Sequence, residues 1–154
     1  MINGLDSEEK ENILYTIVSS DNVEYVLTKE EMELSDFLKT LTTTDDTNLN
    51  QIYSISLESK TLGKIIEYLK YHKNKIPNEI EKPIVNDFKD IDSIDDWDKE
   101  FILNIGSNYS LKRIIYGANY MIIDSLIQLC CAKIATDLKY LSTEEEIREN
   151  LKKY

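Results

Sequence analysis

The sequence predicts an α+β fold, with strands in the first half of the chain and helices alone in the second. Before residue 58, three runs rich in β-branched and aromatic residues are bounded by polar turns, which is typical of strands. After residue 58, apolar residues recur at the i, i+3, i+4 and i+7 spacing of helices. With 154 residues, the chain fits one domain, or one domain with an appendage, and can bury a core without metal ions or disulfides.

The first predicted element is a β-hairpin, because "ILYTIV" (13–18) and "VEYVL" (23–27) flank the polar turn "SSDN". Thr28 then starts a helix, since Glu31 three positions later completes a capping box. The residues of this helix that are expected to point inward are Met32, Phe37, Leu38 and Leu41.

Residues 42–50 are polar and lack periodicity, so they are expected to form a loop. The run "QIYSISL" (51–57) alternates in polarity, which predicts a third strand with an apolar face of Tyr53, Ile55 and Leu57. Ser59 is expected to cap the next helix, whose last turn carries the cations of "KYHKNK" and whose apolar face consists of Leu62, Ile65, Ile66 and Leu69. Both prolines fall in residues 76–96, which are expected to form an irregular, solvated acidic linker.

The remaining segments all have helical patterns. Asp95 or Asp96 is expected to cap "DDWDKEFI", and Ser110 is expected to cap "LKRIIYGA", with Leu111, Ile114, Ile115 and Ala118 on one face. The following helix, "DSLIQLCCAKIATDL" (124–138), carries Leu126 and Leu129 beside a main stripe of Ile127, Cys130, Ile134 and Leu138. A second capping box, formed by Ser142 and Glu145, predicts a last helix that carries Ile147 and Leu151.

The charge of the chain restricts its partners. A formal net charge of −11 repels phosphate, so neither nucleic acid nor an anionic membrane is an expected partner, whereas basic proteins are. No apolar run reaches the ~18–20 residues of a membrane span, and the acidic start "MINGLDSEEKEN" does not resemble a signal peptide. The adjacent Cys130 and Cys131 are expected to be buried, reduced thiols, which indicates a cytoplasmic and nuclear protein.

No residue pattern indicates an enzyme, a metal site or a cofactor. The acidic run "DFKDIDSIDDWD" fails as a calcium loop because, counted from Asp90, its fifth position is Ile94 and its sixth is Asp95, where the loop needs a ligand and a glycine. His72 lies among lysines at a helix end, where a surface imidazole is expected. The four glycines are scattered, so no phosphate-binding loop is present. The protein is therefore expected to be non-catalytic.

One helix face carries the composition of a protein interface. At about 100° per residue, four residues of the helix after Ser110 point away from its apolar stripe: Lys112, Tyr116, Asn119 and Tyr120. Paired tyrosines beside an asparagine are typical of interfaces, because their rigid rings bury a large area at a small entropic cost.

Four motifs of the second half, in this order and spacing, resemble the S-phase-kinase-associated (Skp) family. They are "WDKEFI" (97–102), "ANY" (118–120) with Ile123, "LIQLCCAKIA" (126–135) and "TEEEIR" (143–148). The front half is also similar to the family, with its "SSD" hairpin turn, its polar loop and a helix that ends in "YHKNK" before an acidic linker. The members of this family are adaptor subunits of SCF ubiquitin ligases.

The resemblance implies a BTB/POZ domain over residues 1–123, with a small three-stranded sheet packed by helices, and a shortened helical extension over residues 124–154 that binds F-box proteins. It implies an adaptor that bridges a cullin scaffold to F-box substrate receptors in ubiquitin-dependent protein degradation. The cullin-facing residues would be Asn119 and Tyr120, with Lys112 and Tyr116 on the same face. The F-box contacts would be Leu126, Ile127, Cys131, Ile134, Leu138, Ile147 and Leu151.

The sequence also departs from the family pattern. Ile122 stands where the family motif has Asp, and Gly117 replaces an Ala. The sequence ends at Tyr154, where family members continue into a further helix, so the F-box surface is expected to be incompletely covered and to pair copies of the chain when no F-box partner is bound. Two alternatives are an elongin-C-like cullin adaptor, which would lack most of residues 124–154, and a self-associating BTB scaffold.

Overall fold

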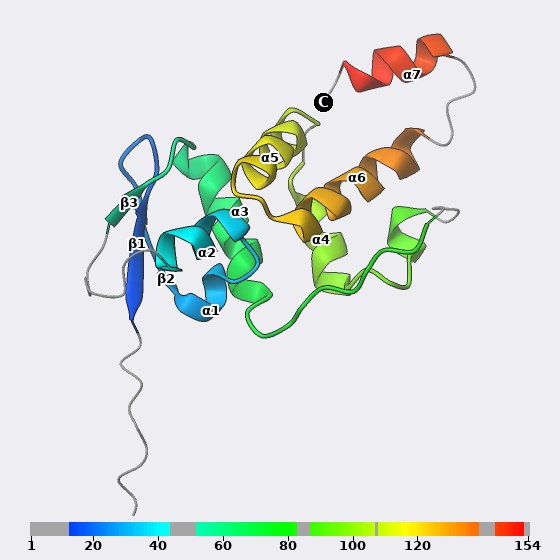
Figure 1. The fold of residues 1–154 in the computed structure, drawn as a ribbon. Coiled ribbons are helices and arrows are strands. Elements are labelled where there is room, and N and C mark those ends of the chain that lie inside the picture. The colour runs from blue at the N-terminus through cyan, green and yellow to red at the C-terminus, as the bar shows by residue number, and fades with distance from the viewer. Residues whose placement is uncertain (1–12, 44–51, 83–86, 107, 139–143, 153–154) are drawn as a thin grey trace, which may run out of the picture.

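The structure is a computed structural model that describes residues 13–43, 52–82, 87–106, 108–138 and 144–152. Figure 1 shows the predicted α+β arrangement, with the strands in the first half of the chain. The described elements are β1 (Leu14–Val18), β2 (Glu24–Thr28), α1 (Lys29–Met32), α2 (Asp36–Thr43), β3 (Ile52–Ser54), α3 (Ser59–Tyr71), the 3₁₀ helix η2 (Phe88–Asp90), α4 (Asp96–Asn104), α5 (Asn108–Tyr120), α6 (Asp124–Leu138) and α7 (Glu144–Leu151).

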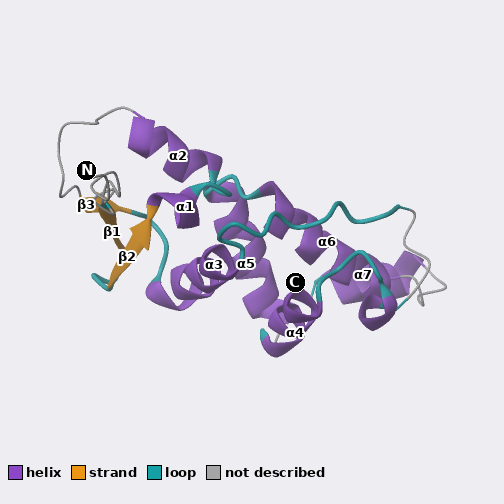
Figure 2. Cartoon of the chain, turned by 90° about the horizontal axis from the view of Figure 1, so that it is seen from below, coloured by secondary structure: helices purple, strands orange, loops and turns teal. Residues whose placement is uncertain are grey.

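The three strands form one sheet in the order β2-β1-β3. The predicted hairpin is confirmed, because β1 and β2 are antiparallel, with Tyr15 opposite Leu27. The third strand is confirmed but short: β3 runs parallel to β1, and Ile55 and Leu57 on the predicted apolar face are buried just beyond its end. Figure 2 shows the sheet at one end of the molecule and α6 and α7 toward the other.

The predicted single helix after Thr28 is two helices. The capping box is present, because the Thr28 hydroxyl accepts from the Glu31 N–H at 3.3 Å and the Glu31 carboxylate accepts from the Thr28 N–H at 3.1 Å. Nevertheless α1 ends after one turn, and α2 starts after the fully buried Ser35. The Ser35 hydroxyl accepts from the Leu38 N–H and donates to the Met121 carbonyl at 2.5 Å. Local periodicity cannot predict this contact, because Met121 lies 86 positions after Ser35.

The start of α3 is capped from the hairpin turn and not by Ser59, which is already its first residue. The Asp21 carboxylate accepts from the Ser59 N–H at 2.7 Å and from the Ser59 hydroxyl at 2.5 Å. It also accepts from the Ser19 hydroxyl at 2.6 Å. The hydrogen bonds from Ser19 and Ser59 lower the pKa of Asp21 to about 2. The hairpin turn is thereby fixed to α3.

Three other predicted boundaries have mixed outcomes. Asp95 caps α4 as predicted, since its carboxylate accepts from the Trp97 N–H at 2.7 Å. Ser110 is not a cap, because α5 begins at Asn108 and Ser110 lies in its first turn. The predicted loop over 42–50 is wrong for Thr42 and Thr43, which belong to α2; its other residues, and Gln51 and Ser142, lie outside the described residues.

The acidic segment 76–96 is more than a solvated linker. It contains η2, and its apolar residues Phe88, Ile91 and Ile94 are buried with between 4% and 7% of their surface exposed. The prediction of a wholly solvated linker is therefore wrong. Phe88, Ile91 and Ile94 are spaced three positions apart, so they form one apolar side that faces the core. The prediction missed this spacing because most of the residues around it are charged.

His72, predicted to be a surface imidazole, lies buried at the carboxyl end of α3 and is 4% exposed. Its Nε2 is 2.6 Å from the carboxylate of Asp98, which is also 4% exposed, and its Nδ1 is 2.9 Å from the Lys75 carbonyl. Both ring nitrogens thus face acceptors. The prediction failed because the partner carboxylate comes from α4, 26 positions later.

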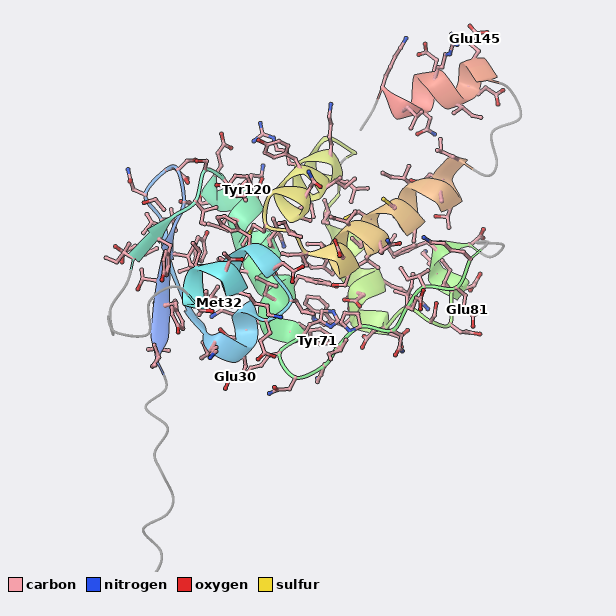
Figure 3. All side chains as sticks on the ribbon, viewed as in Figure 1. Glu30, Met32, Tyr71, Glu81, Tyr120 and Glu145 are labelled. Atoms are coloured by element: carbon pink, nitrogen blue, oxygen red, sulfur yellow. The ribbon has the colours of Figure 1, made fainter. Side chains whose placement is uncertain are left out.

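A stack of aromatic rings covers this hydrogen-bonded pair. The ring of Tyr71, labelled in Figure 3, lies 4.0 Å from that of Trp97 with an angle of 4° between the planes. Trp97 stacks in turn on Phe101 at 5.1 Å. The Tyr71 hydroxyl donates to the Asp95 carboxylate at 3.0 Å. These contacts hold α4 against the end of α3.

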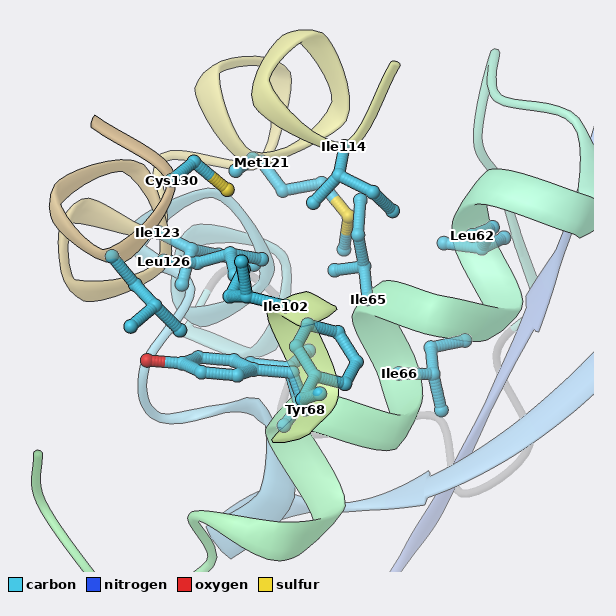
Figure 4. Packing of buried hydrophobic residues seen from close by; sticks show 14 of the residues in the cluster. Leu62, Ile65, Ile66, Tyr68, Ile102, Ile114, Met121, Ile123, Leu126 and Cys130 are labelled. Carbon is cyan, nitrogen blue, oxygen red and sulfur yellow. The ribbon is translucent and has the colours of Figure 1, made fainter. Parts of the chain in front are cut away.

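A single cluster of buried side chains extends from the sheet to α6, and Figure 4 shows part of it. Tyr68 is fully buried, and its hydroxyl is 2.9 Å from that of Ser125 on α6. Burial raises the pKa of Tyr68 well above its usual range. Ile123, Leu126 and Cys130 belong to the same cluster. Helix α6 therefore completes the core that α3 and α5 begin.

Candidate binding surfaces

The outward side of α5 is exposed as its sequence predicted. We call Lys112, Tyr116, Asn119 and Tyr120 the α5 face. Lys112 and Asn119 are exposed, and Tyr116 is 65% exposed. Tyr120, labelled in Figure 3, is half-buried because its ring packs at 5.4 Å and 56° against that of Phe37 on α2. The four predicted residues thus lie on one side of α5, and Phe37 joins them.

The opposite side of α5 packs tightly on α3. Leu111, Ile114 and Ala118 are buried as predicted, whereas Ile115 is only partly buried. A Cβ placed on Gly117 would lie 2.5 Å from the Cδ1 of Ile65. This close approach of α5 to α3 fixes the position of the α5 face.

Helix α5 ends in a left-handed turn. Ile122 has φ 52°, the Ile123 N–H donates to the Ala118 carbonyl at 2.9 Å, and the Ile122 N–H donates to the Asn119 carbonyl at 3.2 Å. These two bonds define a Schellman motif, in which the left-handed position is usually glycine. The turn is also bonded to the start of α2. The Asp36 N–H donates to the Ile122 carbonyl at 3.1 Å, and the Phe37 N–H donates to the Met121 carbonyl at 3.3 Å.

Helix α6 has a buried side and a partly exposed side. The buried side consists of Leu126, Leu129, Cys130, Ala132 and Thr136. The other side carries four residues spaced by four, three and four positions, which we call the α6 row: Ile127, Cys131, Ile134 and Leu138. Cys131 is exposed and the other three are half-buried.

Two predictions on α6 are therefore corrected. Leu126, predicted as an F-box contact, is fully buried beside Tyr68 in the core, so it is not available on the surface (Figure 4). The predicted main stripe also contained residues from both sides of α6, because Cys130 belongs to the buried side and the other three residues to the partly exposed side. Only one of the two thiols is buried as predicted: burial raises the pKa of Cys130 to about 12, while Cys131 is exposed.

The last helix, α7, presents the other two predicted contacts. Ile147 is half-buried and Leu151 is 46% exposed. In Figure 1, α7 lies on the far side of α6 from the sheet. Its Lys152–Glu149 ion pair, at 3.1 Å, is exposed.

Comparisons with known proteins agree on one family. A scan against models of protein families finds no match. The chain is 42% identical over 94 residues to the "S-phase kinase-associated protein 1 homolog" of Tetrahymena thermophila, a match that covers 61% of this chain and 55% of the relative. It is 30% identical over 130 residues to the "E3 ubiquitin ligase complex SCF subunit sconC" of Arthroderma otae, which covers 84% of this chain and 77% of the relative.

The chain belongs to the Skp family. The "Suppressor of kinetochore protein 1" of Schizosaccharomyces pombe is a further relative, 27% identical over 130 residues, with 84% of this chain and 79% of the relative covered. The family resemblance of the sequence is thereby confirmed. The α+β class is confirmed as well, and the small sheet with its packed helices is consistent with the BTB/POZ fold expected of a Skp family chain.

Two features of this Skp family chain, in the part that the structure describes, bear on metal and ligand binding. Among those residues, no group of three or more His, Cys, Asp or Glu side chains could hold a metal ion. The cavity beside His72 and Gln128 has a volume of about 370 Å³, but the imidazole at its wall is already bonded to Asp98. No helix in the described ranges is long and apolar enough to cross a membrane.

Sequence reasoning missed two members of these surfaces. Phe37 was assigned to the interior, yet it is half-buried and contacts Tyr120. Ile122 was noted only as a departure from the family motif, whereas it is 45% exposed. A signal for Ile122 was present, because an apolar residue two positions after the "ANY" that ends the helix occupies a position where a turn favours glycine or asparagine.

Proposed function

We propose that this protein is a non-catalytic adaptor subunit of an SCF-type cullin-RING ubiquitin ligase in the cytoplasm and nucleus. It bridges a cullin scaffold to F-box substrate receptors in ubiquitin-dependent protein degradation. Membership in the Skp family supports this proposal, since the relative in Arthroderma otae is named an SCF subunit. The observation that carries it is the presence of two separate outward surfaces, the α5 face and the α6 row, on helices that share one core.

The F-box side consists of the α6 row with Ile147 and Leu151 of α7. Its apolar side chains are half-buried or exposed, although the inner side of α6 already supplies the core. A soluble domain seldom leaves such a row open without a partner, since burying apolar surface yields about 25 cal/mol per Å². The same row is where we expect two copies of the chain to pair when no F-box partner is bound.

The cullin side consists of the α5 face with Phe37. The Tyr116 ring is 65% exposed and accessible to a partner, whereas the Tyr120 ring is held in one orientation by its contact with the Phe37 ring. Oriented aromatic rings favour binding because little side-chain entropy is lost. The two surfaces share no residue, which an adaptor requires.

Thiol labelling tests the F-box side. In the free protein we expect a maleimide to react with Cys131 and not with Cys130, which is fully buried and has a raised pKa of about 12. A saturating F-box segment from the same organism should slow the labelling of Cys131 at least tenfold. Cys131→Ser is the control, and it should not be labelled until the protein unfolds. Labelling of Cys131 at an unchanged rate would contradict this half of the proposal.

The cullin side is tested by pulldown with variants of each surface. Asn119→Lys combined with Tyr120→Lys should abolish capture of the cullin N-terminal region and leave F-box capture intact, since loss of a central interface tyrosine costs about 2 kcal/mol or more. Cys131→Lys should have the opposite effect. Because Tyr120→Lys removes the contact with Phe37, Asn119→Lys alone serves where the double variant is unstable. Capture of elongin B, or of this chain alone, would support the elongin-C-like or self-associating alternative instead.

A further inference from the structure

Ile122 combines three properties that are unusual at a position that ends a helix. Its backbone is left-handed, with φ 52°, a conformation that a β-branched side chain adopts only with strain. Its side chain is 45% exposed. It is also the residue at which the sequence leaves the family motif, which has Asp there. Backbone strain that persists in a folded protein is characteristic of functional positions.

The turn itself does not require isoleucine. Its geometry is set by main-chain bonds, from the Ile123 N–H to Ala118 and from the Ile122 N–H to Asn119. The Ile122 carbonyl is used as well, since it accepts from the Asp36 N–H. Glycine or asparagine would make all of these bonds with less strain. The core of the turn is supplied by Met121 and Ile123, both of which are fully buried.

The surroundings of Ile122 indicate what it contacts. It follows Asn119 and Tyr120 of the α5 face by two or three positions, so it extends that face at the end of the helix. Two exposed acidic residues lie near its backbone: Asp36, whose N–H donates to the Ile122 carbonyl, and Asp124, two positions later in the chain. An exposed aliphatic side chain with acidic residues nearby is complementary to an apolar pocket with a basic rim.

We propose that Ile122 is a specificity-determining anchor of the cullin-binding surface. Its side chain enters an apolar pocket in the N-terminal helical region of the cullin, and Lys or Arg side chains at the rim of that pocket face Asp36 and Asp124. This inference rests on the proposed adaptor function and adds to it the residue that selects the partner. A cullin that accommodates Asp at this point would present a polar site and bind this chain weakly.

Two substitutions separate binding from folding. Ile122→Asn tolerates the left-handed backbone and removes the apolar side chain, whereas Ile122→Leu keeps an aliphatic side chain without branching at Cβ. The probe is the N-terminal helical region of a cullin from the same organism, and the readouts are Kd by titration calorimetry and the melting temperature. Ile122→Asn should raise Kd tenfold or more without lowering the melting temperature. Ile122→Leu should keep Kd within about threefold of the wild type.

The proposed pairing of Asp36 and Asp124 with the basic rim is tested separately. Asp36→Asn combined with Asp124→Asn should raise Kd and weaken the dependence of Kd on salt concentration, because exposed charges steer association through a screened field. Cys131→Lys, on the other surface, is the control and should leave cullin affinity unchanged.

Each outcome decides the inference. A Kd unchanged by Ile122→Asn, in a protein whose cullin binding is abolished by Asn119→Lys, would overturn the role of Ile122 and leave the adaptor function standing. Loss of binding together with a melting temperature lowered by Ile122→Asn would make Ile122 a structural residue and also overturn the inference. A wild-type protein that binds no cullin would overturn both the inference and the cullin half of the proposed function.

Discussion

Replacement of His72 by Leu should destabilise this protein more than any surface substitution on the same helix. The side chains of His72 and Asp98 are 2% and 6% exposed and lie 2.6 Å apart. Loss of one partner leaves the other as an uncompensated buried polar group, which costs about 3–5 kcal/mol. That cost is a large part of the roughly 5–15 kcal/mol by which a domain is stable. At about 2–4 °C per kcal/mol for a chain of this size, the melting temperature should fall by about 6–20 °C.

Urea unfolding followed by far-ultraviolet circular dichroism provides the measurement, with the midpoint expected to shift while the slope stays constant. Lys64→Met is the matched control on α3, since it removes the Lys64–Glu67 pair, whose side chains are 47% and 52% exposed, and exposed pairs contribute about 0–1 kcal/mol. His72→Leu combined with Asp98→Ala should be more stable than His72→Leu alone, because the unpaired carboxylate is then gone. A midpoint for His72→Leu that equals the midpoint for Lys64→Met would refute this reasoning.

Two further predictions concern the start of α3 and its packing against α5. The pKa of Asp21 is lowered to about 2, so its ionised form stabilises the fold above pH 4 and that contribution is lost as the pH falls toward 2; the difference in urea midpoint between the wild type and Asp21→Asn should therefore shrink over this range, and a constant difference would contradict it. Gly117→Ala should lower the urea midpoint, because the added Cβ would lie 2.5 Å from Ile65 and overpacking costs about 1–3 kcal/mol. Combining it with Ile65→Val should restore part of that loss, whereas purely additive effects would show that the two positions do not meet.

The elements of this fold were predictable wherever the signal was local. The hairpin around "SSDN", the capping box at Thr28 and the cap at Asp95 depend on residues within a few positions of each other, and all are present. The exposure of Lys112, Tyr116 and Asn119 followed from helical periodicity alone. The family was predictable too, because its motifs are spread over the chain in a fixed order.

Three of the failures share one cause, which is a partner distant in the sequence. Ser35 ends α1 because it reaches Met121, and Asp21 replaces the predicted cap of α3 by reaching across 38 positions. His72 is buried because Asp98 comes from another helix. On α6, both sides are apolar, so periodicity could not decide which side faces the core and assigned Leu126 to the surface. The structure resolves that choice, because Ser125, next to Leu126, lies against Tyr68 in the core.

The aromatic stack at the α3–α4 contact gives the protein an intrinsic optical probe. Trp97 is the only tryptophan of the sequence, and its ring stacks with those of Tyr71 and Phe101, so its emission depends on this contact remaining closed. No residue of α4 belongs to the α5 face or the α6 row. Fluorescence of the unmodified chain should therefore stay constant when either surface is occupied and change when the core opens, which lets one spectrum distinguish a variant that fails to bind from one that fails to fold.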